Sequence, residues 1–203
     1  MAEISHLYDK YNGNYLECAF FTVKFRDVFS MQRLYELLHE WLVEEEWAGH
    51  VRDDATFPET FYLKREDQVS GIEQWIHWRL KKYAEGSENW RADMLVQFHI
   101  LNLKDTEVLH QGQKYKANSG EVEIKCWVNL VPEFIKWREN FILKHFIDVF
   151  WKRFLWKDRE RWKNDFMREG YRFQEAIKGY FKLVTFLPES ELQGFYPKKD
   201  FTT

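Results

Sequence analysis

The chain has 203 residues, of which 45% are hydrophobic and 31% charged, with a formal net charge of −3. This balance excludes a mainly disordered chain, and the length is sufficient to bury a core. Aromatic residues make up 19% of the sequence, whereas glycine (9) and proline (4) are scarce. Few turn formers favour long regular elements joined by few loops.

Charge is unevenly distributed along the chain. Residues 1–132 carry 15 Lys and Arg against 22 Asp and Glu, whereas residues 133–183 carry 13 against 8. Basic and aromatic residues alternate from Trp151 to Phe173, as in nucleic-acid-binding segments. Acidic residues three or four positions from most of these cations instead indicate a helix with internal ion pairs. We therefore expect no nucleic-acid partner, because the chain as a whole is not basic.

The two cysteines, Cys18 and Cys126, are too few for a disulfide framework or a zinc ribbon. Both fall in strand-like alternation, where a thiol is usually a small buried side chain. The first 14 residues lack the apolar run of a signal peptide, and no window of 18 uncharged apolar residues occurs. We expect a cytoplasmic protein without a transmembrane segment.

Aromatic and β-branched residues predict a strand over residues 15–26, and apolar residues at three- and four-residue spacing predict a helix over residues 31–47. Ser30 is a candidate N-cap of this helix. Its last turn holds Glu44, Glu45 and Glu46, where the helix dipole disfavours anions. These glutamates are either a cation or partner site or, more simply, a solvated acidic end.

Residues 71–83 fit both a capped helix and an alternating strand; their aromatic content and strand-rich surroundings favour a strand. Further strands are predicted over residues 61–66, 93–103 and 121–130, with a hairpin over 108–116 that turns at Gln111 and Gly112. Residues 118–120 (Asn-Ser-Gly) predict a turn.

A helical pattern runs from Pro132 to about Leu183. One continuous helix of this length would span about 75 Å, roughly twice the width of a compact chain of this size. We therefore predict a break, either in the charged run 157–163 or at Gly170, or else a projecting helix. The predicted organisation is a sheet with one helix (residues 1–132), a helical segment in the same domain (133–187) and an irregular tail (188–203).

The segment 141–156 (FILKHFIDVFWKRFLW) is apolar around most of its helical circumference. A surface helix needs only one apolar face, so this helix has a second contact. That contact is the core, another chain or a membrane interface, of which the membrane is the least favoured. The candidate interface residues are aromatic: Phe146, Phe150, Trp151, Phe154 and Trp156.

The strand segment GEVEIK places Glu123 two residues before Lys125, as in metal-dependent nucleases of the restriction-enzyme type. Such a site also needs an upstream aspartate, for which Asp105 and Asp93 are candidates. The simpler interpretation of Glu-x-Lys on a strand is cross-strand charge pairing. The order of elements also departs from that family, which begins with a helix.

The seven histidines show no metal-ligand spacing, and His99, among apolar strand residues, is predicted to be a core histidine. The sequence contains no glycine-rich phosphate loop, no Gly-x-Ser-x-Gly and no Cys-x-x-Cys. We therefore expect no metal, no cofactor and, on balance, no enzymatic activity.

The stretches QWIHWRLKKY, FHILNLKDTEVLHQGQK, GEVEI and ILKHF resemble an uncharacterised family of small archaeal proteins, over residues 60–180. That resemblance implies no established activity. The order strand, helix, antiparallel strands and long helix is similar to helix-grip folds of the START and polyketide-cyclase type. Those folds often have two helices after the first strand, and their last helix is shorter. The similarity implies a curved sheet closed by the last helix around a hydrophobic cavity.

Together these patterns predict an α+β fold: an antiparallel sheet of five to seven strands, one N-terminal helix and a long C-terminal helix across the sheet. The leading functional hypothesis is a non-enzymatic binding or assembly module that self-associates through the aromatic helix. A hydrophobic small-molecule or lipid binder is the first alternative, and a metal-dependent nuclease the second.

Overall fold

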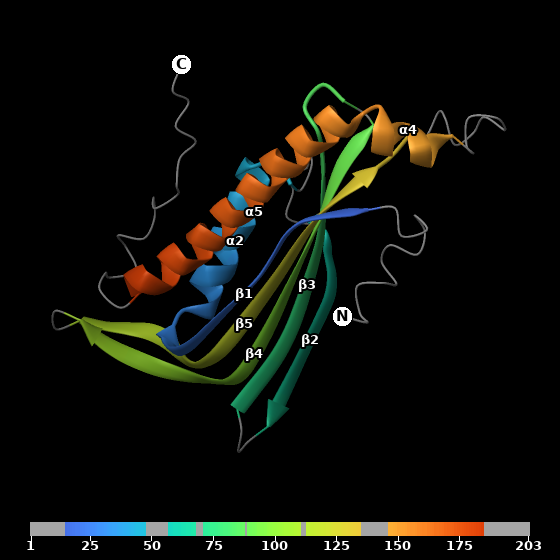
Figure 1. Cartoon of the computed structure of the whole chain (residues 1–203). Helices are drawn as coiled ribbons and strands as arrows, with labels where there is room; N and C mark the ends of the chain where they lie inside the picture. Colours follow the sequence, from blue (N-terminus) through green and yellow to red (C-terminus); the bar gives the residue numbers. More distant parts are fainter. Residues whose placement is uncertain are drawn as a thin grey trace.

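A five-stranded antiparallel sheet packs against helices in the computed structural model, which describes residues 15–47, 57–67, 71–87, 89–110, 113–134 and 146–184 (Figure 1). The elements are β1 (Leu16–Phe29), α2 (Met31–Glu44), β2 (Glu59–Asp67), β3 (Gly71–Tyr83), β4 (Trp90–His110), β5 (Gln113–Pro132), α4 (Ile147–Arg153) and α5 (Trp156–Val184). Spatially the strands are ordered β1-β5-β4-β3-β2. The predicted α+β class is confirmed, as is the long helix across the sheet.

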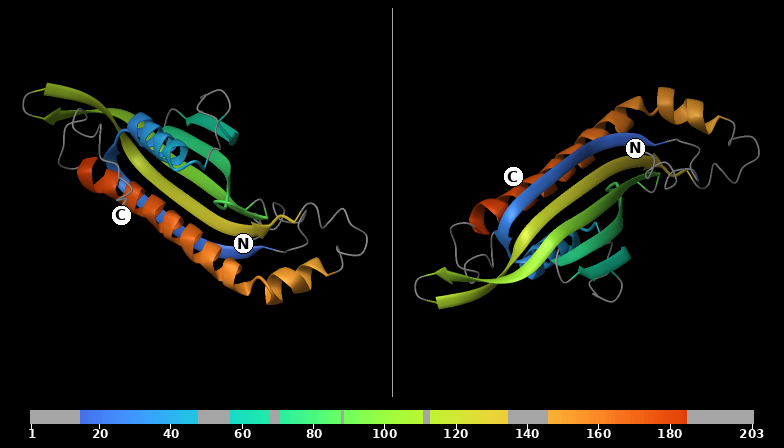
Figure 2. Two further views of the ribbon diagram at one scale, coloured as in Figure 1. Left: turned by 90° about the horizontal axis from the view of Figure 1, so that it is seen from above. Right: turned by 90° about the horizontal axis from the view of Figure 1, so that it is seen from below.

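Helices α2 and α5 lie on the same face of the sheet, which we call the inner face (Figures 1 and 2). Strand alternation explains this one-sided burial. On β5, the residues that face the helices are all buried: Val122, Ile124, Cys126, Val128 and Leu130. On β3, Ile76, Trp78 and Leu80 are buried in the same way, so the strand prediction for residues 71–83 is confirmed.

The start of α2 is fixed by three side chains from different parts of the chain. Ser30 caps the helix, since its Oγ accepts a hydrogen bond from Arg33 N at 3.4 Å. The Tyr180 hydroxyl donates to Ser30 O at 2.7 Å and accepts from Ser30 N at 3.2 Å. Met31 N donates to Asn118 Oδ1 at 3.1 Å. The N-terminus of α2 is therefore held by both α5 and β5.

Gly170 brings α5 close to the sheet. A Cβ at this position would lie 3.1 Å from both Ala19 Cβ and Val128 Cγ2, which is tighter than ordinary packing. On either side of Gly170, α5 buries larger residues, among them Phe166 and Phe173. The prediction that the helix breaks at Gly170 is wrong, because α5 continues through this residue. The absence of a side chain at Gly170 instead allows the helix to pack closely on the sheet.

The break between α4 and α5 lies instead at Phe154 and Leu155. The predicted break at 157–163 is also wrong: the charged run is helical, and the adjoining turn is held by ion pairs of Asp165 with Arg161 and Arg168. The predicted start of this helical stretch at Pro132 is also wrong, because Pro132 ends β5. Residues 135–145, which follow, lie outside the described residues.

The predicted turn at residues 118–120 is wrong, because β5 runs through it without interruption. The reason is a bulge in the neighbouring strand. The pairing register of β4 with β5 changes between Leu101 and Lys104, and Asn102 has a φ of 54°. A Cβ on Gly120 would lie 3.0 Å from the Leu101 carbonyl oxygen. Gly120 is therefore needed because β4 and β5 approach each other closely at the bulge, and not because the chain turns there.

The hairpin between β4 and β5 is confirmed by the pairing of His110 with Gln113, although the two turn residues themselves lie outside the described part. Both cysteines are buried and unpaired with each other, as predicted. Burial raises the pKa of Cys18 to about 12 and also raises that of Cys126.

We expect Gly170→Val to lower the free energy of unfolding by about 2 kcal/mol, because the added side chain overlaps Ala19 and Val128. Urea unfolding monitored by tryptophan fluorescence measures this difference. Tyr171→Val is the control, since it places the same β-branched residue at the next, exposed position of α5. The control should cost about 0.5 kcal/mol or less. Equal losses in both variants would contradict the close-packing role of Gly170.

Candidate functional site

The end of the molecule formed by α4 and the first turn of α5 carries large exposed hydrophobic side chains. The exposed fractions are 62% for Phe146, 51% for Val149, 72% for Phe154 and 50% for Trp156. We call these four residues the aromatic end. Scattered exposed hydrophobics are normal, but four large ones within eleven residues form a patch of the kind that marks a contact surface.

Helical spacing explains why these side chains face outward. Phe146, Phe150 and Phe154 follow one another at four-residue intervals and so lie on one side of α4. The rings of Phe150 and Phe154 are stacked with centroids 5.6 Å apart. Trp151 directly follows Phe150 and so projects in a different direction, where its ring meets Trp90 edge-on at 6.2 Å. Helix α4 is therefore apolar on two faces, one inside the core and one outside.

Cations lie beside two rings at this end of the molecule, the buried Trp151 and the exposed Trp156. Lys152 Nζ lies 5.1 Å from the Trp151 ring centroid, and Lys157 Nζ lies 5.7 Å from that of Trp156. Such contacts keep the ammonium groups beside the aromatic surface without burying their charge. The aromatic end is therefore basic at its margin, which is compatible with a partner surface that carries acidic residues.

Of the five predicted interface residues, the structure places three in an exposed position: Phe146, Phe154 and Trp156. Phe150 is half-buried. Trp151 is only 5% exposed and belongs to the core, so it is not available as an interface anchor. The sequence shows the surplus of aromatic residues on this helix but does not show which side turns inward.

The predicted nuclease residues do not converge. Glu123 accepts from Lys24 Nζ at 2.9 Å and lies 3.3 Å from Lys125 Nζ. Lys24 lies directly opposite Glu123 on β1, so the charge-pairing interpretation accounts for this glutamate. Asp105 accepts from Asn118 Nδ2 at 2.9 Å, five residues and about 17 Å along β5 from Glu123. Asp93, the other candidate, is paired with Arg91.

No group of three or more potential ligands within the described ranges could hold a metal ion. His99 is also not the core residue predicted. It lies on the outer face of the sheet, half-exposed, where its Nε2 is 3.1 Å from Glu73 Oε1 and its ring stacks on Trp75. The apolar neighbours in the sequence belong to the other face of β4.

The lysines alter the acidity of Glu123. Partial burial tends to raise its pKa, but the hydrogen bonds from Lys24 and Lys125 outweigh burial and hold the pKa below its usual range. A carboxylate with a lowered folded-state pKa stabilises the fold above its unfolded-state pKa. That stabilisation is lost as the pH falls through the folded-state pKa.

We expect Glu123→Gln to be less stable than the wild type at pH 7 by about 0.5 kcal/mol. The difference should shrink toward zero as the pH falls below the lowered pKa of Glu123, because the wild-type carboxylate is then protonated. Urea unfolding between pH 7 and pH 3 measures it. Glu121→Gln, on the same strand face, is the control, since no ion pair joins Glu121 to a described residue. A Glu123 difference that does not change with pH would contradict the lysine pairing.

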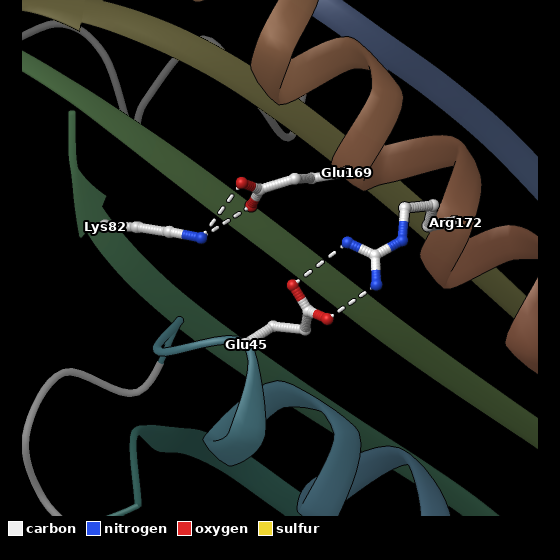
Figure 3. A network of polar contacts seen from close by, with 4 residues as sticks. All are labelled: Glu45, Lys82, Glu169 and Arg172. Carbon is white, nitrogen blue, oxygen red and sulfur yellow. Dashed lines mark hydrogen bonds and ion pairs between the residues drawn. The ribbon is translucent and has the colours of Figure 1, made fainter. Parts of the chain in front are cut away.

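Two ion pairs tie α5 to the rest of the molecule (Figure 3). Arg172 donates from both terminal nitrogens to the Glu45 carboxylate, at 2.7 and 3.2 Å. Lys82 Nζ donates to both oxygens of Glu169, at 2.8 and 2.9 Å. Glu45 is buried, so the interpretation of residues 44–46 as a merely solvated acidic end does not hold for Glu45. Its partner is a cation of the same chain.

A hollow of about 420 Å³ lies beside this network, lined by the end of β3 and one side of α5. Its cations include Lys82, Arg168 and Arg172, each of which is paired with an acidic residue. An anionic ligand would have to displace those carboxylates. The network therefore holds the helices and the sheet together and does not form an anion site.

The space between α2, α5 and the sheet contains packed rings. Phe173 lies 5.0 Å from Trp41 and 6.4 Å from Phe21, and Trp78 lies 4.6 Å from Phe98, measured between ring centroids. A helix-grip fold would hold its ligand between the last helix and the sheet. Here the described side chains fill this region, which does not favour the ligand-binding alternative.

We expect Glu45→Gln to lower the free energy of unfolding by about 1–2 kcal/mol, since it leaves Arg172 without a buried counter-ion. Glu175→Gln is the matched control on α5, where Glu175 pairs with Lys178 at 3.1 Å in an exposed position. That pair should contribute less than about 0.5 kcal/mol. Chemical denaturation of both variants measures the difference, and equal effects would contradict a structural role for the Glu45–Arg172 pair.

Comparison with known proteins adds little to these observations. No family model and no curated protein matches the chain. Among solved structures, activated Cyt2Ba monomer from Bacillus thuringiensis subsp. israelensis is similar at a TM-score of 0.36 and 11% identity, over 60% of this chain and 75% of that one. A likeness this weak carries no argument about function. None of the described helices is long and apolar enough to cross a bilayer.

Proposed function

We propose that this protein is a non-enzymatic binding and assembly module that associates with further copies of itself through the aromatic end. The single observation that carries the proposal is the exposed face of α4, where Phe146, Val149 and Phe154 project away from the core. Leaving such a surface in water is unfavourable, and a partner that covers it removes this cost. Aromatic residues are also the side chains that most often dominate interface energies.

The size of the patch sets the expected strength of association. A large hydrophobic side chain has about 150–250 Å² of accessible surface in the unfolded chain. Four such side chains that are half-exposed therefore present about 400 Å² of apolar surface. Two copies together would cover about 800 Å², below the roughly 1,200–2,000 Å² buried in a stable interface. Loss of translational and rotational freedom costs about 4–15 kcal/mol. Self-association through the aromatic end is therefore expected to be weak and concentration-dependent.

The alternatives receive less support from the described residues. The nuclease hypothesis requires Glu123, Lys125 and an aspartate at one site, and the candidate aspartates are paired elsewhere. The ligand-binding hypothesis requires a cavity where the rings of Trp41 and Phe173 meet. Neither alternative uses the exposed face of α4.

Phe154→Glu combined with Trp156→Ala should lower the average mass in light scattering, because it places a charge and removes an aromatic ring on the contact surface. Both side chains are exposed, so the variant should remain folded by circular dichroism. The control combines Leu109→Glu with Tyr171→Ala, which changes exposed hydrophobics elsewhere on the molecule. This control should keep the wild-type mass. A wild-type mass of 25.0 kDa at every concentration, or an equal loss in the control, would contradict the proposal.

A further inference from the structure

Strand β2 forms one border of the sheet, and all nine of its residues are exposed. It pairs with β3 along one side only. Three consecutive large side chains project from its middle: Phe61, Tyr62 and Leu63 are 43%, 53% and 47% exposed. An open strand edge carries N–H and C=O groups that can pair with a further strand.

The two borders of the sheet differ in their surroundings. Helix α5 lies along β1 and β5, where Phe25 and Phe181 stack at 4.3 Å. Strand β2 lies at the opposite border, away from α5 (Figures 1 and 2). At its first residue, the Glu59 carboxylate accepts from Tyr35 Oη of α2 and from Trp78 Nε1 of β3, whereas Phe61, Tyr62 and Leu63 are exposed. The middle of β2 is therefore the accessible edge.

We propose that a second copy of this chain pairs with β2 in antiparallel fashion, so that two five-stranded sheets join into one. This inference goes beyond the aromatic end, because it uses a separate surface. It follows from the self-complementarity of the segment ETFYLKRED. A two-fold axis through Leu63 allows the five residues Phe61–Arg65 of each copy to pair, and the irregularity between Glu59 and Phe61 lies outside this stretch.

On the outer face of the sheet, this register continues an existing apolar row. Leu63 lies directly opposite Trp75 within one copy. Across the two-fold axis, Leu63 would meet Leu63 of the second copy, with a Trp75 ring on each flank. Phe61 would face Arg65 of the second copy, and a guanidinium that lies on the face of an aromatic ring makes a favourable cation–π contact. Cross-strand pairs of this kind stabilise a sheet.

On the inner face, the charges are compatible with the same register. Tyr62 would lie opposite Lys64. A shift that centres the axis on Lys64 would set two ammonium groups directly opposite each other, which is unfavourable. Shifts by a single residue would pair side chains from opposite faces. Centring on Tyr62 shortens the regularly paired segment from five residues to three. The strand therefore selects the axis at Leu63.

A cross-link tests both the contact and its register. In Leu63→Cys, two thiols on the two-fold axis should form a disulfide under mild oxidation, because directly opposed Cβ atoms lie about 4.5–5.5 Å apart. The native thiols, Cys18 and Cys126, are buried and do not compete. Leu109→Cys, at an exposed site on the β4 extension, is the matched control. We expect covalent dimer from Leu63→Cys at least tenfold faster than from Leu109→Cys. Equal rates would overturn the inference.

A second measurement separates this contact from the aromatic end. In the Phe154→Glu, Trp156→Ala background, light scattering should show a species of twice the 25.0 kDa chain mass. Adding Leu63→Lys places two lysine side chains directly opposite each other on the two-fold axis and should halve that mass. Adding Leu109→Lys should leave the mass unchanged. If the background variant is already monomeric, the β2 inference fails while the aromatic end stands. If the Phe154 and Trp156 changes leave unaltered a wild-type mass of twice 25.0 kDa, the proposed function fails while β2 pairing stands.

Discussion

The close packing of α5 on the sheet at Gly170 is the contact on which the rest of the architecture depends. Without a side chain at this position, the helix axis can approach Ala19 and Val128 on the two strands beneath it. That approach lets Phe173 reach Trp41 of α2 and lets Arg172 reach Glu45. A helix held farther from the sheet would weaken both contacts, because each depends on close approach: 5.0 Å between the ring centroids and 2.7 Å between the charged groups. The position of α2 therefore follows from that of α5.

Much of the fold could be predicted because strand alternation and helical spacing are local signals. They identify β5 by its alternating apolar residues and α2 by its N-cap and apolar stripe. They fail where a residue serves a neighbour distant in sequence. Gly120 has the composition of a turn but accommodates the Leu101 carbonyl, and Gly170 resembles a helix break but accommodates the sheet. In both cases the decisive partner lies on another element.

The candidate site was predictable in part for the same reason. The excess of aromatic residues near Phe150 indicates a second contact, but spacing alone does not distinguish the face that Trp90 covers from the exposed one. The pairing of Arg172 with Glu45 joins residues 127 positions apart, and Arg172 also has Glu169 and Glu175 three positions away on its own helix. Glu123 illustrates the opposite case, in which the simple interpretation of cross-strand pairing with Lys24 is the one that the structure supports.

The pairing of β1 with β5 also has a consequence for the order of folding. Strand β1 precedes the other described strands in the chain, yet its partner among the described residues is the segment 118–130, roughly a hundred residues away. During synthesis, β2, β3 and β4 can pair one after another as they are made. Strand β1 and the apolar face of α2 can be buried only after β5 has been made. The hydrophobic residues of β1, such as Phe21, stay exposed during that interval. Pairing at this border, late in synthesis, is thus the step at which the nascent chain is most in need of protection from aggregation.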